Sequence, residues 1–139
     1  MQMVFQDPLA SFDPKMKIVD ILTEPLINFG KLKKSEKEAK ARELLEMVEL
    51  PGDFVDRYPH NMSGGQRISI ARALSLEPEI LVCDEATSAL DVSVQESVIE
   101  LLVRLQKEKN ISMLFICHDL ALIRSFAHQI AVMISGKYR

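Results

Sequence analysis

The stretch that decides the fold is Ile80-Leu81-Val82-Cys83-Asp84-Glu85, in which four apolar residues are followed at once by two acidic ones. A short strand without polar alternation is typical of a parallel sheet that helices cover on both faces. We therefore expect residues 80–83 to form a strand buried on both faces. The acidic pair should then lie at the carboxyl edge of the sheet, where ligands bind in α/β proteins.

The downstream sequence supports a β-α-β unit. Apolar residues recur at helical spacing over residues 94–105, and a second apolar run, Met113–Cys117, ends at His118. Further along, residues 120–127 have the pattern of another helix and residues 130–134 that of a third strand. We expect an α/β fold with a mostly parallel sheet flanked by helices.

Upstream, residues 3–5 indicate the end of another short strand, and Pro8 bars further ladder pairing. Gln6 is therefore expected at a strand-to-loop junction. Two helices should follow, the first over residues 18–27. The second should begin at a capping box formed by Ser35 and Glu38, with one apolar face made by Ala41, Leu44, Leu45 and Val48.

The run Ser63-Gly64-Gly65-Gln66 precedes an expected helix over residues 67–76. Two glycines leave main-chain N–H groups unshielded, and the positive end of the helix dipole would point at a docked anion. The run therefore suits a phosphate-binding surface. A Ser-Gly-Gly turn that merely caps the helix would have the same sequence.

Composition narrows the functional classes. The chain has 139 residues, 47% of them hydrophobic, and a formal net charge of −3, which suits one globular domain and gives no broad basic footprint for nucleic acid. Cys83 and Cys117 lie in apolar runs and are expected to be buried thiols of a reduced, intracellular protein. We expect neither a membrane span nor an export leader.

The strand ends carry side chains suited to phosphate chemistry. Asp84 could hold Mg²⁺ through water, Glu85 could orient or deprotonate an attacking water, and His118 could contact a terminal phosphate. The alternatives are a solvated acidic turn and a packing histidine.

In this order along the chain, the motifs resemble the nucleotide-binding subunit of an ABC transporter from its glutamine loop onward, as a partial P-loop NTPase-like fold with an inserted helical subdomain. The resemblance implies that Gln6, Glu85 and His118 are catalytic and that Asp84 and Gln6 hold Mg²⁺, mainly through water. The matching positions are Gln6 for the glutamine loop, Ser63, Gly64, Gly65 and Gln66 for the signature, residues 80–84 for the Walker B strand, Glu85 for the catalytic glutamate, Ser88 to Asp91 for the D-loop and His118 for the switch histidine.

The wording around these motifs, at residues 5–14, 58–60 and 82–93, resembles the oligopeptide, dipeptide and nickel importers of bacteria. That family implies ATP and Mg²⁺ as cofactors, bound between the P-loop of one subunit and the signature of a second. It also implies transporter membrane subunits as partners, no nucleic acid, and a cytoplasmic location on the inner face of the membrane. The expected division is 1–14 for the glutamine loop, 15–62 for the helical subdomain and 63–139 for the signature and catalytic part.

The chain departs from the family in two ways. These 139 residues contain no G-x-x-x-x-G-K-[ST] loop to hold the β and γ phosphates. Behind the signature, Gln66-Arg67-Ile68 is two residues shorter than usual, which would rotate a helix face by roughly 200°. Either the helix starts later, or Ser63 has a different aim.

Two functions remain in view. One is a fragment of an importer ATPase, and the other is a truncated, non-catalytic module that docks to transporter subunits. A chromosome-maintenance or DNA-repair ATPase would share several motifs but would carry a long coiled coil between Gln6 and Ser63. Only 57 positions (63 − 6) separate these residues here, so we discount it.

Overall fold

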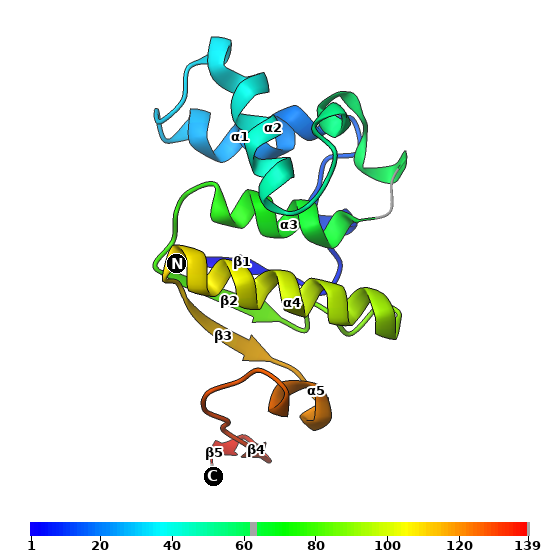
Figure 1. The fold of residues 1–139 in the computed structure, drawn as a ribbon, viewed down its shortest axis with the longest axis vertical. Coiled ribbons are helices and arrows are strands. Elements are labelled where there is room, and N and C mark those ends of the chain that lie inside the picture. Colours follow the sequence, from blue (N-terminus) through cyan, green and yellow to red (C-terminus); the bar gives the residue numbers. More distant parts are fainter. Residues whose placement is uncertain (62–63, 139) are drawn as a thin grey trace.

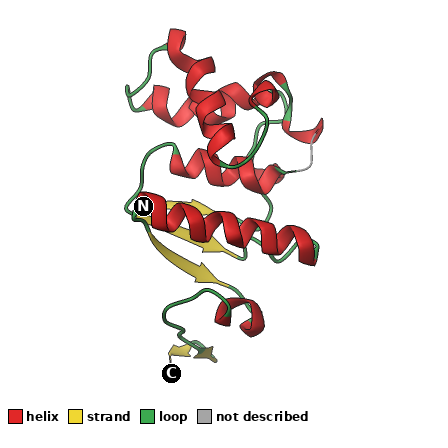
Figure 2. Cartoon of the chain, in the orientation of Figure 1, coloured by secondary structure: helices red, strands yellow, loops and turns green. Residues whose placement is uncertain are grey.

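The computed structural model describes residues 1–61 and 64–138, with three layers of elements stacked along its long axis (Figure 1). Figure 2 shows helices at one end, a sheet in the middle and a small hairpin at the other end. The α-helices and strands are, in chain order, β1 (Gln2–Val4), α1 (Ile18–Asn28), α2 (Lys37–Met47), α3 (Gly65–Leu74), β2 (Ile80–Asp84), α4 (Val92–Lys109), β3 (Ser112–Ile116), α5 (Leu120–Arg124), β4 (Met133–Ile134) and β5 (Lys137–Tyr138). Short 3-10 turns lie at η1 (Leu9–Ser11), η2 (Lys34–Glu36), η3 (Gly52–Asp56) and η4 (Pro59–Asn61).

The sheet is parallel, with the strand order β1-β2-β3. Val4 is the partner of Cys83, and Cys83 is the partner of Phe115. This register confirms the predicted β-α-β unit and places the ends of all three strands at one edge.

One face of the sheet is covered and the other is open. The covered face carries Val4, Leu81 and Cys83, each with 0% exposure, in one core with side chains of α3 and α4. The opposite face is apolar but solvent-exposed, with Met3, Ile80, Leu114 and Ile116 between 39% and 56% accessible. Our prediction that the 80–83 strand is buried on both faces is therefore wrong for this chain, because α3 and α4 share one side.

The helical unit, described over residues 15–61, packs through the apolar face predicted for α2. Ala41, Leu44, Leu45 and Val48 are all buried against α1 and the rest of the core. The expected Ser35–Glu38 capping box does not form, because residues 34–36 make the turn η2. There the Glu36 carboxylate accepts the Lys33 N–H at 3.1 Å.

The predicted third strand at residues 130–134 is wrong. Its last two residues form β4, which pairs antiparallel with β5 in a separate two-stranded sheet. After α5 the chain reaches β4 through residues 125–132 without adding a strand to the parallel sheet.

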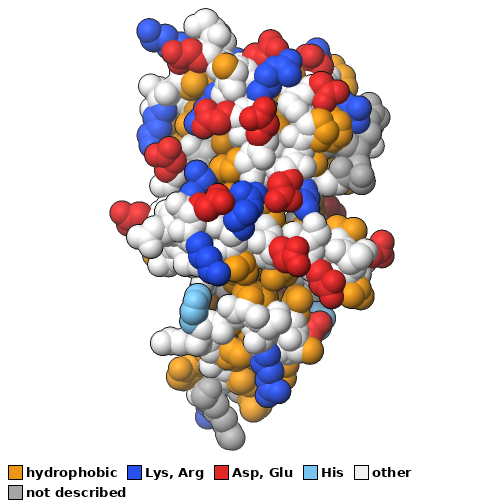
Figure 3. Space-filling model, viewed as in Figure 1, with side chains coloured by type: hydrophobic (Ala, Val, Ile, Leu, Met, Phe, Trp, Pro, Cys, Tyr) orange, Lys and Arg blue, Asp and Glu red, His pale blue; other side chains and the backbone are white. Residues whose placement is uncertain are grey.

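Because one face of the sheet is open, the chain has more solvent-accessible surface than a compact monomer of the same length. The accessible surface is 8670 Å², against about 7,300 Å² for a compact monomer of this length. Figure 3 shows hydrophobic side chains gathered over the lower part of the molecule, around β3, α5 and the hairpin, while charged side chains crowd the helical unit. Among the described residues, no helix is long and apolar enough to cross a membrane.

We expect the isolated chain to self-associate through this exposed apolar surface or to be marginally stable. Leu114→Lys, at a side chain 56% exposed, should change the free energy of unfolding by no more than about 0.5 kcal/mol and reduce association. The matched control, Leu81→Ala in the buried core, should cost about 2–5 kcal/mol. Thermal unfolding and sedimentation at several concentrations measure both, and a sharp, concentration-independent transition of a monomer would contradict the expectation.

Candidate functional site

The catalytic candidates are brought together by the ladder between β2 and β3. Asp84 is the partner of Ile116, and the Glu85 N–H donates to the Ile116 carbonyl at 2.8 Å. His118 follows two residues later, and its Nδ1 lies 3.7 Å from Glu85 Oε1. The parallel register therefore places the predicted glutamate and histidine face to face.

The loop after β1 closes the other side of the site. Gln6, Asp7 and Ser11 line a hollow of about 570 Å³ together with Asp84 and Glu85. Asp7 Oδ1 accepts the Ala10 N–H at 3.2 Å, which fixes the turn that follows Gln6. The hollow thus joins the glutamine loop to the acidic strand end, as a shared sheet edge predicts.

Glu85 has a positive φ of 47°. Few residues other than glycine adopt this left-handed conformation, and such strain is most often found at functional sites. The Glu85 carbonyl accepts both the N–H and the hydroxyl of Ser88, at 3.1 and 3.0 Å. The turn carrying Ser88 therefore holds the glutamate backbone in place.

The hollow fits a magnesium ion held chiefly by water and phosphate. Asp84 and Glu85 are half-buried and line this hollow together with Gln6. Within the described residues, no group of three or more His, Cys, Asp or Glu side chains forms a metal cage. Magnesium usually takes one or two carboxylates and completes its shell with water and substrate phosphates, so this donor set suits it.

The signature candidates lie at the start of α3. Gly64 is the N-cap with a φ of 108°, and the helix begins at Gly65, so it does not start later despite the shorter sequence. A Cβ on Gly65 would lie 3.1 Å from Leu9 Cδ2, so a larger residue there would require the Leu9 side chain beside the glutamine loop to shift. Ser63 lies outside the described residues.

Gln66 is 4% exposed, and its amide donates to the Phe5 carbonyl at 3.3 Å. This bond ties the start of α3 to the residue before Gln6. Asp91 is exposed and precedes α4 as its N-cap, and within the described part of the chain its side chain accepts no capping hydrogen bond. Asp91 and Ser88 thus bracket the turn between β2 and α4.

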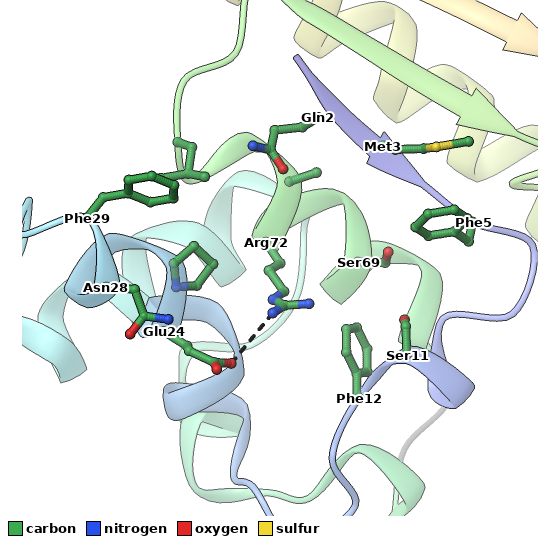
Figure 4. Close-up of a pocket in the computed structure, with 13 residues that line it drawn as sticks. Gln2, Met3, Phe5, Ser11, Phe12, Glu24, Asn28, Phe29, Ser69 and Arg72 are labelled. Atoms are coloured by element: carbon green, nitrogen blue, oxygen red, sulfur yellow. Dashed lines mark ion pairs between the residues drawn. The ribbon is translucent and has the colours of Figure 1, made fainter.

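A second hollow, of about 400 Å³, was not anticipated from the sequence. Figure 4 shows Arg72 reaching from α3 toward Glu24 of α1, with Phe12 and Phe29 among the lining residues, and the ion pair is 3.5 Å long. Arg72 Nε is buried without an acceptor among the described residues. Its residues are dispersed over four elements, so no sequence motif marks it.

The two cysteines differ in environment. Burial raises the pKa of the Cys83 thiol from an ordinary 9.0 to about 12, whereas Cys117 is half-exposed beside His118. The prediction of a buried thiol is confirmed for Cys83 and does not hold in full for Cys117, which lies just beyond the end of β3.

The sequence of this chain is similar to those of known proteins. The family model described as ABC transporter matches residues 1–88. The chain belongs to the ABC transporter family. Over 138 residues it is 50% identical to a putative peptide import ATP-binding protein of Brucella abortus, covering 98% of this chain and 41% of the relative. It is 50% identical over 141 residues to the oligopeptide transport ATP-binding protein OppF of Bacillus subtilis, covering 99% of this chain and 46% of that protein.

A solved structure shows the fold independently. The ATP-binding cassette MJ0796, solved as a dimer in a post-hydrolysis state with ADP and Pi, superposes with a TM-score of 0.70 at 30% identity, over 88% of this chain and 55% of that one. The ABC ATPase fold expected from the sequence is therefore confirmed. The chain spans less than half the length of the two curated relatives.

We expect Cys83 to resist alkylation in the folded chain, because its thiol stays protonated, while Cys117 reacts. Between pH 9.0 and about 12 the folded state keeps a proton that the unfolded state has lost, so stability falls as pH rises, by at most about 1.4 kcal/mol per unit. Denaturant unfolding at each pH, compared with Cys83→Ala, measures this. Equal slopes for both proteins would show that Cys83 does not contribute.

Proposed function

We propose that this chain carries the hydrolytic and signature parts of an ATP-binding subunit that drives import of peptides or related solutes. The observation that carries the proposal is the meeting of Gln6, Asp84 and Glu85 in one hollow, with His118 facing Glu85 at 3.7 Å. Family membership supports ATP as the nucleotide. The names of the two relatives support peptide import.

Each residue has a role in this proposal. Asp84 and Gln6 hold Mg²⁺ mainly through water, Glu85 orients or deprotonates the attacking water, and His118 contacts the terminal phosphate. The bound Mg²⁺ would supply charge to neutralise the phosphates.

The signature, Ser63 to Gln66, acts in trans on the nucleotide of a second ATP-binding subunit, and the D-loop residues Ser88 and Asp91 lie beside it in the assembled site. The other partners are the membrane subunits of the transporter. The chain would lie in the cytoplasm, peripheral on the inner face of the membrane. The division into residues 1–14, 15–62 and 63–139 follows these three tasks.

The absence of a phosphate-binding loop within these residues makes a clear prediction for the chain alone. Because the donors for the β and γ phosphates are missing, we expect no saturable binding of Mg-ATP up to millimolar concentration. Titration calorimetry at several protein concentrations measures it. Saturable micromolar binding would mean that other residues clamp the phosphates, and the proposed roles would have to be reassigned.

Turnover should appear when the chain is mixed with an ATP-binding subunit that has this loop. In that mixture Glu85→Gln should lower kcat by about 10²–10⁴-fold if Glu85, and not a residue of the partner, is the general base for the nucleotide that the partner's loop holds. The matched control is Glu100→Gln, at an exposed position on α4. If only the control matched the wild type, the catalytic role of Glu85 would be supported; if Glu85→Gln matched it too, Glu85 would not catalyse this turnover.

A further inference from the structure

The end of α2 has an unusual residue in a position that normally suits glycine. Glu49 has a φ of 62°, its N–H donates to the Glu46 carbonyl at 3.0 Å, and the Leu50 N–H donates to the Leu45 carbonyl at 2.9 Å. This pair of bonds is a Schellman motif, in which the left-handed residue is usually glycine because a Cβ is strained there. A glutamate at this place calls for a reason outside the turn.

The Glu49 carboxylate joins two helices of the core. One oxygen, Oε2, lies 3.3 Å from Arg67 Nη1 on α3, and the other, Oε1, lies 3.3 Å from Arg104 Nη2 on α4. A single side chain of the helical unit is thus shared between two core arginines. Both pairs depend on the reach of a glutamate from a fixed backbone.

The same arginines cap the end of α2. Arg104 donates to the Met47 carbonyl and Arg67 to the Val48 carbonyl, each at 3.0 Å. Arginine satisfies free carbonyls at a helix end and interacts favourably with its negative dipole. Arg67 also donates to the hydroxyl of Ser97 on α4, and its side chain is only 15% exposed. Its guanidinium group therefore has three partners, Glu49, Val48 and Ser97.

This joint lies directly beside the signature glycines. Arg67 is in the first turn of α3, three residues after Gly64. Leu50, which follows Glu49, has its Cδ2 3.6 Å from where a Cβ on Gly64 would be. The Leu50 side chain therefore lies next to the glycine turn at the start of α3.

We propose that Glu49 is a positioning residue that fixes the Gly64–Gly65 turn against α4, so that the α3 N-terminus faces a partner's nucleotide. The inference rests on the proposed function for its biochemical consequence but not for its structural one. Glu49 acts through Arg67, Arg104 and Leu50 and touches no nucleotide itself. Its backbone strain is retained because the carboxylate is needed.

The structural test compares two glycine substitutions on the complete chain. Glu77 is another exposed glutamate with a positive φ, 49°, after α3, and no hydrogen bond or ion pair of its side chain occurs among the described residues. Glu77→Gly should raise Tm by relieving strain. Glu49→Gly should relieve the same strain, yet leave Tm unchanged or lower it. It should also speed exchange of the Ile68 amide, which donates to the Gly64 carbonyl, at least tenfold.

Hydrogen exchange followed by NMR gives a graded readout. Glu49→Gln keeps one acceptor oxygen, so its Ile68 amide should exchange at a rate between those of wild type and Glu49→Gly. Because Glu49 is 56% exposed, the difference between wild type and Glu49→Gln should shrink in 1 M NaCl. If both glycine variants raised Tm alike and left Ile68 exchange unchanged, Glu49 would serve only as a turn residue and the proposal would fail.

The functional arm uses turnover by a partner subunit with a phosphate-binding loop. Glu49→Gly should lower kcat at least threefold with little change in the KM for ATP, because the phosphate clamp belongs to the partner, and Glu77→Gly should not. If the wild-type chain gave no turnover, the proposed function would be overturned. The structural role of Glu49 would still be tested by the exchange rate of the Ile68 amide. Normal kcat for Glu49→Gly, with altered exchange, would overturn the link to the nucleotide.

Discussion

The parallel pairing of β2 with β3 is the interaction on which the rest of the molecule depends. Because Asp84 pairs with Ile116, the acidic pair and His118 leave the sheet at the same edge. The bond from the Glu85 N–H to the Ile116 carbonyl extends the ladder by one step and carries the glutamate, in its left-handed conformation, toward the histidine. A slip of one residue would send these side chains to opposite faces. The site is therefore a consequence of register rather than of local sequence alone.

Much of this arrangement could be predicted from the sequence. The uninterrupted apolar runs identified β2 and β3, and the acidic residues directly after β2 identified the functional edge. The burial of α2 followed from its helical spacing. The errors have physical causes: an apolar run does not show which of its faces finds a helix, and Ile80 and Leu114 are exposed because α3 and α4 pack on one side. Short local signals could not show that residues 133–134 pair with β5 instead of with the parallel sheet.

The contacts that sequence reasoning missed join residues far apart in the chain. Arg67 and Arg104 reach the end of α2 from 18 and 57 positions away, and Gln66 reaches the Phe5 carbonyl from 61 positions away. No motif marks them, because each arginine looks like an ordinary solvated residue on a helix. One clue was present: Glu49 lies between the apolar end of α2 and Pro51, where glycine would be the natural stop signal.

The start of α3 shows how the chain accommodates its short signature helix. The helix begins at Gly65 and is held by Gln66 on one side and by Arg67 on the other, so its rotation about its own axis is set at the first turn. Gln66 is buried and bonded to Phe5, and to reach the nucleotide of a partner it would have to break that bond. The main-chain N–H groups at Gly64 and Gly65, with the positive end of the helix dipole behind them, need no such rearrangement. For the phosphate contact proposed above, the backbone of the glycine turn therefore suits the role better than the glutamine side chain does.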